Sequence, residues 1–288
     1  MDAGAGYPAQ AAACRGNVFL QWSPGPGRTC FIAGTEMARY ELLNNVTHKN
    51  LRVATGFGHE FGDDVGMVPA FPSEYAELQR EYPIFFRKDR DSGEWQSVAL
   101  LGFEQRENLF LQDGRWNAGY LPGAVAKGPF LIGFQEQRID GELRKEPVLH
   151  VDVEHPRVGS SEGEAVFLAQ GGQSPYLQHI AGVLRGIRDG TEFGTAMFAA
   201  FDSLGLIHPV NLDVQLDEKH RINVSGLHGI DRERLAALDA ASLQRLNQAG
   251  YLEGAYLVLA SLHNVRRLMA EKQRRLRGQD AAAPERAA

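Results

Sequence analysis

The stretch that decides the fold is YPIFFRKDRDSGEWQSVALLGFEQRENLFLQDGRWNAGYLPGAVAKGPFLIGF, residues 82–134. It is the part of the chain densest in aromatic and turn-forming residues. Its short apolar runs lie at residues 84–86, 98–103 and 109–111. They are separated by Asp91-Ser92-Gly93 and by Gln112-Asp113-Gly114, and short apolar runs bounded by such turns are typical of antiparallel strands joined by tight connections. We therefore predict a β meander here.

The composition places the chain among ordinary globular proteins. Of its 288 residues, 43% are hydrophobic and 23% are charged. The net charge of -6 argues against a general nucleic-acid binder, because neutralising phosphates requires a basic surface. The two cysteines, Cys14 and Cys30, are too few for a disulfide framework or a zinc site.

The distribution of apolar, Gly and Pro residues along the chain indicates how it is organised. No apolar run is long enough to span a membrane, and the first residues lack the charged and apolar regions of a signal peptide, so we expect a cytoplasmic protein. Residues 1–35 are rich in Gly, Ala and Pro and are expected to form a mobile leader. We expect one domain over residues 36–277 and a disordered tail over 278–288. A two-part split near residue 170 is the alternative.

The remaining elements are predicted from local signals. Strands are expected at residues 130–135, 147–153 and 164–168, and a hairpin at 210–215 and 222–224. Helices are expected at 74–81, from the N-cap Ser174 onward, at 191–204 ending at Gly205, and from 231 to 277 with a break at Gly250. These elements predict an α+β fold, in which an antiparallel β-rich N-terminal half packs with a helix-rich C-terminal half.

One short motif suggests a metal. His150 and Asp152 lie two residues apart on a predicted strand, so both side chains project from the same face and could hold one iron ion. His208 or His220 would be the third ligand. The alternative interpretation is a hydrogen-bonded His-Asp pair on a strand face, with no metal.

Aromatic residues near the turns of the meander are candidates for ligand binding. Trp95, Arg115, Trp116 and Tyr120 could form an aromatic rim with a charged edge, because Trp and Tyr combine apolar contact area with a polar group. The alternative is that the aromatic residues belong to the core of the β layer. The sequence has no nucleophile elbow and no phosphate-binding glycine loop, which makes nucleotide-dependent catalysis an unfavoured interpretation.

Several segments, in order, resemble the SapC-like family over about residues 45–270. They include THKNLRV (47–53), EYPIFF (81–86), ALLG (99–102), ENLF (107–110), DGRW (113–116), YLP (120–122), PYLQ (175–178) and GLHGID (226–231). The resemblance implies a protein of the kind encoded near surface-layer and outer-membrane receptor genes of Gram-negative bacteria, and it carries no established catalytic residues. His150 departs from the family's pattern.

The expected function is therefore a non-catalytic accessory protein of surface-layer or outer-membrane uptake systems. It would bind a protein partner or a small ligand without a cofactor. The alternative is a non-haem iron oxidoreductase that uses the His-x-Asp pair, so the sequence leaves open whether the protein is an enzyme. A homodimer is a further expectation, formed through the apolar helix face with Leu252, Tyr256 and Leu259.

Overall fold

The computed structural model describes residues 38–89, 92–139, 142–159, 161–216 and 221–282. Its contacts divide the chain into two compact units. Unit 1 combines the chain up to Thr55 with Lys127–Leu184, and unit 2 combines Gly56–Ala126 with Arg185–Ala288. The expected leader (1–35) and the last six residues of the expected tail lie outside the described residues, and the single domain stays a prediction. The mixed α+β fold is confirmed, with antiparallel sheets mostly in the first part and helices mostly in the C-terminal part.

Unit 1 contains two small antiparallel sheets. One has the order β1-β9-β8 and is formed by β1 (Tyr40–Leu42), β9 (Glu142–Asp152) and β8 (Phe130–Ile139). The other pairs β2 (Arg52–Val53) with β10 (Glu164–Ala165). Helix α3 (Pro175–Ser203) begins as predicted, because the Ser174 hydroxyl accepts a hydrogen bond from the Leu177 amide at 3.2 Å.

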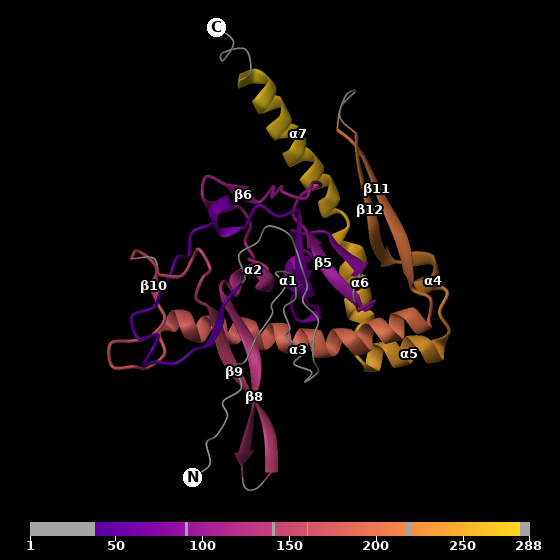
Figure 1. Cartoon of the computed structure of the whole chain (residues 1–288). Helices are drawn as coiled ribbons and strands as arrows, with labels where there is room; N and C mark the ends of the chain where they lie inside the picture. The colour runs from indigo at the N-terminus through magenta and orange to yellow at the C-terminus, as the bar shows by residue number, and fades with distance from the viewer. Residues whose placement is uncertain (1–37, 90–91, 140–141, 160, 217–220, 283–288) are drawn as a thin grey trace. The chain divides into compact units, whose positions relative to one another are not determined.

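Unit 2 is built on a five-stranded antiparallel sheet (Figure 1). Its order is β11 (Ile207–Gln215), β12 (Arg221–Ile230), β4 (Ile84–Lys88), β5 (Trp95–Leu100) and β3 (Met67–Ala70). The predicted β4–β5 and β11–β12 hairpins are confirmed. A separate hairpin joins β6 (Leu111–Gln112) to β7 (Arg115–Trp116). Asp113 (φ 49°) and Gly114 (φ 72°) are both left-handed in its turn, which is the conformation that an Asp-Gly hairpin turn favours.

Short helices and the C-terminal helices complete unit 2. The short ones are η1 (His59–Phe61), η2 (Pro72–Glu74), α1 (Tyr75–Leu78) and α2 (Gly123–Ala126). The expected helical region from residue 231 divides into α4 (Arg232–Ala236), α5 (Ala240–Gln248), α6 (Tyr251–Ser261) and α7 (Asn264–Ala282). Gly250, with φ 76°, separates α5 from α6 as predicted. No helix among the described residues has the length and apolar character needed to cross a membrane.

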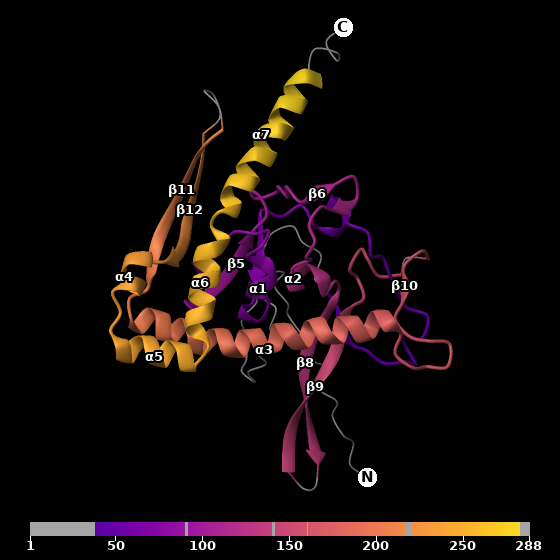
Figure 2. The same cartoon turned by 180° about the vertical axis from the view of Figure 1, so that it is seen from behind.

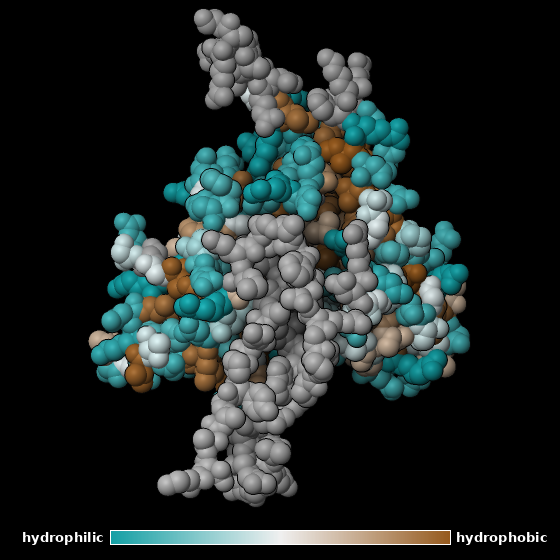
Figure 3. Space-filling view, viewed as in Figure 1, coloured by the Kyte–Doolittle hydropathy of each residue, from teal (hydrophilic) through white to brown (hydrophobic). Residues whose placement is uncertain are grey.

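Helix α7 runs beside the β11–β12 hairpin, as Figures 1 and 2 both show. The Gln273 side-chain amide donates a hydrogen bond to the Leu216 carbonyl at 2.7 Å. Apolar side chains gather where the helix and the hairpin meet, as the brown surface in Figure 3 shows. Partly buried residues of both elements pack there against the core, among them Leu212 and Leu276. The opposite side of α7 is therefore the side that remains available for other contacts.

The prediction of a separate helix at 191–204 is wrong, because α3 continues from Pro175 to Ser203 as one helix of 29 residues. Gly190, which precedes the expected start at residue 191, lies inside the continuous helix and allows close packing. A Cβ atom at Gly190 would lie 2.5 Å from the Ser73 Oγ and 2.8 Å from the Phe71 Cβ. The Ser73 hydroxyl also donates to the Gly186 carbonyl at 2.8 Å. The helix thus tolerates glycine because η2 approaches its backbone closely.

Candidate functional site

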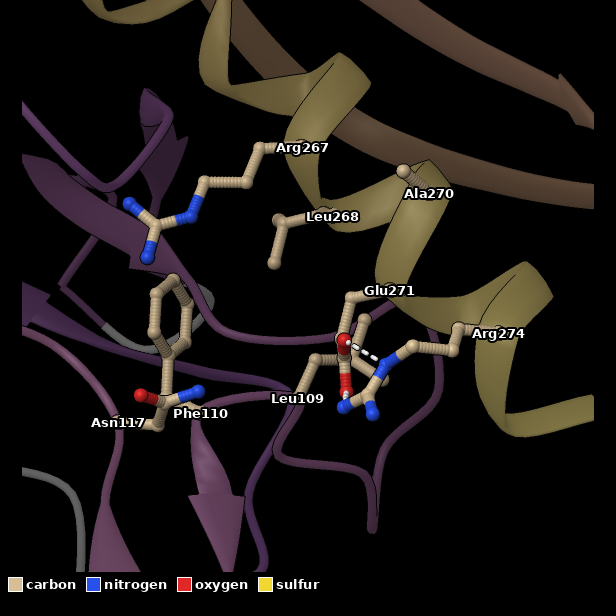
Figure 4. A pocket seen from close by; sticks show the side chains of 8 residues that line it. All are labelled: Leu109, Phe110, Asn117, Arg267, Leu268, Ala270, Glu271 and Arg274. Carbon is tan, nitrogen blue, oxygen red and sulfur yellow. Dashed lines mark hydrogen bonds and ion pairs between the residues drawn. The ribbon is translucent and has the colours of Figure 1, made fainter. Parts of the chain in front are cut away.

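A pocket of about 270 Å³ lies between α7 and the segment that leads into and out of the β6–β7 hairpin (Figure 4). Helix α7 contributes one wall, formed by Arg267, Leu268, Ala270, Glu271 and Arg274. Leu109, Phe110 and Asn117 form the other wall. Apolar side chains therefore make up the middle of the pocket, and charged or amide groups stand around them.

Arg275 holds the second wall against the helix. Its guanidinium donates hydrogen bonds to the carbonyls of Asn108 (3.2 Å), Leu109 (2.8 Å) and Leu111 (3.1 Å). The Asn108 carbonyl also accepts a hydrogen bond from the Leu111 amide at 3.3 Å, and the planar, five-donor guanidinium links all three carbonyls. The backbone beside the pocket is thus fixed by a side chain that comes from α7.

Lys272 fastens the preceding loop to the same helix. Its ammonium group lies 2.8 Å from Glu104 and 2.5 Å from Glu107, and its side chain is only 11% exposed. Burial alone would lower the pKa of Lys272, but the hydrogen bonds to Glu104 and Glu107 raise that pKa overall. Lys272 and Arg275 lie three residues apart on one helix face, so together they position the loop that leads into the pocket.

Arg267 stands at one end of the pocket, between a carboxylate and an aromatic ring. Its guanidinium lies 3.3 Å from Glu81 and 5.9 Å from the centre of the Phe110 ring, toward which it points in Figure 4. Glu81 also accepts hydrogen bonds from the amides of Gly119 (2.7 Å) and Tyr120 (3.1 Å). Half of the Arg267 side chain is exposed, so it retains donors for a ligand.

Arg274 stands at the other end and forms two hydrogen bonds of 2.8 Å with Glu271. The hydrogen bond from Arg274, assisted by a second one from Arg275, lowers the pKa of Glu271 below its ordinary value. Glu271 is therefore ionised at neutral pH and is a weak base. A general base works best with a pKa near the working pH, so the charged groups of this pocket suit binding better than proton transfer.

The arrangement can hold an acidic group attached to an apolar one. Arg267 and Arg274 offer charge-assisted hydrogen bonds to carboxylate or phosphate oxygens. Leu109, Phe110 and Leu268 form a narrow apolar floor, since each is only 2–3% exposed, and the exposed Asn117 amide offers both a donor and an acceptor. No group that must gain or lose a proton is needed for such binding.

Trp116 and Tyr120, two of the four residues predicted to bind a ligand, are linked through hydrogen bonds to Tyr82. The Trp116 indole donates to the Tyr82 hydroxyl at 2.7 Å, and that hydroxyl donates to the Tyr120 carbonyl at 2.5 Å. The Tyr120 hydroxyl in turn donates to the buried Glu74 at 2.8 Å. Their polar ends therefore serve internal hydrogen bonds. The Trp116 ring also stacks on Phe110, at 6.3 Å between centroids and 10° between planes, and so supports the pocket wall from behind.

Trp95 and Arg115 lie elsewhere on unit 2. Trp95 begins β5, contacts the His228 ring at 4.8 Å and donates to Asp202 at 3.3 Å. Arg115 is exposed at the start of β7. None of the four predicted residues lines the pocket beside α7. Their role in ligand binding stays a prediction.

The three residues predicted to hold iron fall into both units. His150 and Asp152 lie on β9 in unit 1, and His208 lies on β11 in unit 2. The Asp152 carboxylate accepts hydrogen bonds from the amides of Arg39 (3.1 Å) and Glu154 (3.2 Å). Within the described ranges, no three His, Cys, Asp or Glu side chains form a group that could hold a metal ion. His220 lies outside those ranges.

The sequence did contain a signal for the pocket residues that were missed. Residues 266–277 are rich in basic residues, a composition that by itself predicts a solvent-exposed helix end. Arg267, Glu271 and Arg274 follow one another at four- and three-residue spacing, so they share one face of a helix. That spacing does not show which segment packs opposite this helix face, and in the structure it is the segment around Phe110.

Comparison with known proteins identifies the chain by family. No curated protein and no solved structure matches it. A family model described as SapC matches residues 43–268, which include both walls of the pocket up to Leu268. The match extends over most of the chain, and the order of the resembling segments agrees with it. The protein therefore belongs to the SapC family.

Proposed function

We propose that this protein is a non-catalytic binding protein, an accessory of bacterial surface-layer or outer-membrane uptake systems. In this proposal, the pocket beside α7 is the place where it takes its ligand or partner. The observation that carries the proposal is the pocket itself, where two half-exposed guanidinium groups flank an apolar patch. The family resemblance favours the association with surface-layer or outer-membrane systems, and the sequence favours a cytoplasmic location.

The chemistry of the lining supports binding without catalysis. Arginine remains protonated at every physiological pH and cannot act as a base. The pKa of Glu271 is lowered by its hydrogen bonds to Arg274 and Arg275, so it does not reach the range of a neutral-pH base. A pocket with these groups recognises an acid but offers it no nucleophile.

The test of the pocket is a substitution that fills it without a change of charge. Ala270 lines the pocket and is exposed on α7, so Ala270→Trp places an indole in the pocket while leaving every arginine in position. Ala199→Trp is the matched control, because Ala199 is also exposed in the interior of a long helix and does not line the pocket. Both changes carry the same helix-propensity cost.

Binding of a panel of organic acids and short peptides is measured by thermal shift and by calorimetry. We expect at least one compound to bind the wild type and Ala199→Trp but not Ala270→Trp. If the panel binds none of the three proteins, or binds Ala270→Trp unchanged, the α7 pocket is not the ligand site.

The link to membrane systems needs a separate experiment in bacterial cells. A photo-crosslinking amino acid at Asn117, on the pocket wall, is expected to capture a component of a surface-layer or outer-membrane uptake system. The same amino acid at Ala199 is the control. Capture of identical proteins from both positions would contradict the proposed association.

A homodimer stays a prediction. Of the three residues expected at its interface, Leu259 is only 8% exposed, Leu252 is partly buried against the core and Tyr256 is 55% exposed. Most of this face therefore packs within unit 2. Sedimentation at two concentrations tests the expectation, and a monomeric mass at both would contradict it.

A further inference from the structure

A second pocket continues the first one along α7. It has a volume of about 410 Å³ and lies between Arg274, Arg275 and Gly278 of the helix and residues 111–113 of the β6–β7 hairpin. Arg274 lines both pockets. We call the two together the α7 groove. Residues 109–113 and Asn117 form one side of it, and the helix side is formed by Arg267, Leu268, Ala270, Glu271, Arg274, Arg275 and Gly278.

The length of the groove suits an extended chain. From Arg267 to Gly278 the helix advances by eleven residues, which is about 16 Å at 1.5 Å per residue. An extended peptide advances about 3.3 Å per residue, so the groove matches about five residues of such a peptide. A small organic acid would occupy only one of the two pockets.

The surface next to the groove is strongly basic. Arg266, Arg267, Arg274 and Arg277 are exposed on α7, and Glu271 is the single acid between residues 264 and 277. At 100° per residue these four arginines fall within an arc of about 100°, so they form a basic stripe on one side of the helix, with Ala270 between the two pairs. The side chains of Arg266 and Arg277 form no hydrogen bond or ion pair with any residue that the structure describes. This stripe attracts acidic partners.

The groove itself differs from a site for nucleic acid or for a lipid surface. Its floor includes Leu109 and Phe110, and two carboxylates, Glu271 and Asp113, line it. A nucleic acid carries a charge at every phosphate and would bring some of these charges against the two carboxylates, whereas a peptide can carry its acids only opposite Arg267 and Arg274. The apolar face of α7 packs inward through residues such as Leu268, so it is not available for insertion into a lipid surface. An extended peptide with acidic side chains and apolar ones between them fits all of these features.

From this combination we propose that the α7 groove binds an extended acidic segment of a protein partner. Arg267 and Arg274 lie seven residues apart, about 10 Å along the helix, and each pairs with one acidic side chain of the segment. Apolar side chains between those acids contact Phe110 and Leu268, and the Asn117 amide pairs with the peptide backbone. This inference rests on the proposed function and narrows it to one class of ligand.

The test uses a fluorescent peptide with the core Glu-Leu-Phe-Leu-Glu, flanked by Gly-Ser, and measures fluorescence anisotropy. Two control peptides replace both Glu residues by Gln or by Lys. We expect the Glu peptide to bind more tightly than the Gln peptide and more weakly as salt rises, because the arginines are exposed to solvent. The Lys peptide is expected to bind weakest.

The variants assign the binding to the groove. Arg267→Gln and Arg274→Gln should each weaken binding of the Glu peptide by about three- to tenfold, which is typical of removing one exposed charge pair at an interface. Ala270→Trp should weaken it further by blocking the groove. Arg277→Gln is the matched control, because Arg277 belongs to the basic stripe but does not line the groove, and a change of less than about twofold is expected there.

The remaining outcomes overturn the inference. If organic acids bind in an Ala270-dependent manner but the Glu peptide does not, the proposed function stands and the peptide assignment is wrong. If the Glu peptide binds Ala270→Trp as well as the wild type, the groove is not its site. Binding of single-stranded DNA or of vesicles containing phosphatidylglycerol through the same arginines, without binding of the Glu peptide, would replace the acidic segment by an anionic polymer or surface.

Discussion

The substitution Arg275→Met tests whether one side chain holds the pocket wall in place. Methionine keeps an apolar stem of similar length, so packing along the arginine stem is largely preserved. What is lost is the guanidinium, with its hydrogen bonds to the carbonyls of Asn108, Leu109 and Leu111 and to Glu271. Glu271 keeps its two hydrogen bonds to Arg274, so the main loss concerns the three carbonyls.

The magnitude follows from the exposure of the site. The Arg275 side chain is 31% exposed, so water can reach part of the space that the guanidinium leaves. Each of the three hydrogen bonds should then contribute about 1 kcal/mol, which is below the usual range for hydrogen bonds to charged groups because water replaces part of the lost interaction. The sum of about 3 kcal/mol corresponds to a fall in Tm of about 6–12 °C for a protein of this size.

The assay compares Arg275→Met with Arg277→Met, two residues further along the same helix. Arg277 is exposed and has no partner in the described part of the chain, so its replacement should change the unfolding free energy by less than about 0.5 kcal/mol. Hydrogen exchange should also become faster at the amides of residues 109–117 in Arg275→Met only. Equal Tm values for the two variants, with unchanged exchange, would refute the role assigned to Arg275.

Three further predictions concern the core, the pH dependence and the metal. Ser261→Ala should lower the unfolding free energy by about 1–3 kcal/mol, because the fully buried Ser261 hydroxyl accepts from the Ile84 amide at 2.9 Å and the amide would lose its partner; urea denaturation measures the loss, and a change below about 0.5 kcal/mol would contradict it. Burial raises the pKa of Glu74 above its ordinary value of 4.5, so the folded state holds this proton to higher pH than the unfolded state does. The stability that Glu74 contributes is therefore complete below its ordinary pKa of 4.5 and falls as pH rises through the raised pKa. The stability difference between wild type and Glu74→Gln should shrink over that window, and a difference independent of pH would contradict this sign. Iron measured by elemental analysis after anaerobic loading should be far below one per chain and equal in His150→Ala, whereas stoichiometric iron lost in that variant would favour the oxidoreductase alternative.

Local signals in the sequence determined most elements of this fold. The Asp-Gly pair at residues 113–114 predicted the β6–β7 turn. A tight hairpin turn requires a left-handed backbone at both central residues, and Asp and Gly are among the residues that adopt it most readily. Ser174 before Pro175 predicted the start of α3, and Gly250 predicted the break between α5 and α6. Such signals act within a few residues of the chain, so they are readable without knowledge of the neighbours in space.

The tertiary structure alone decided which residues share a surface. Trp95 and Trp116 looked like parts of one rim, yet β5 carries Trp95 to His228 while β7 carries Trp116 to Phe110. A separate helix was expected at residues 191–204, yet α3 is continuous, and its Gly190 packs closely against Ser73. The pocket joins Phe110 to Arg267, which are far apart in the sequence. The helical period showed that Arg267 and Arg274 share a face, but only the packing of α7 against the loop around Phe110 placed an apolar partner opposite them, because long-range contacts depend on the whole fold and leave no local pattern.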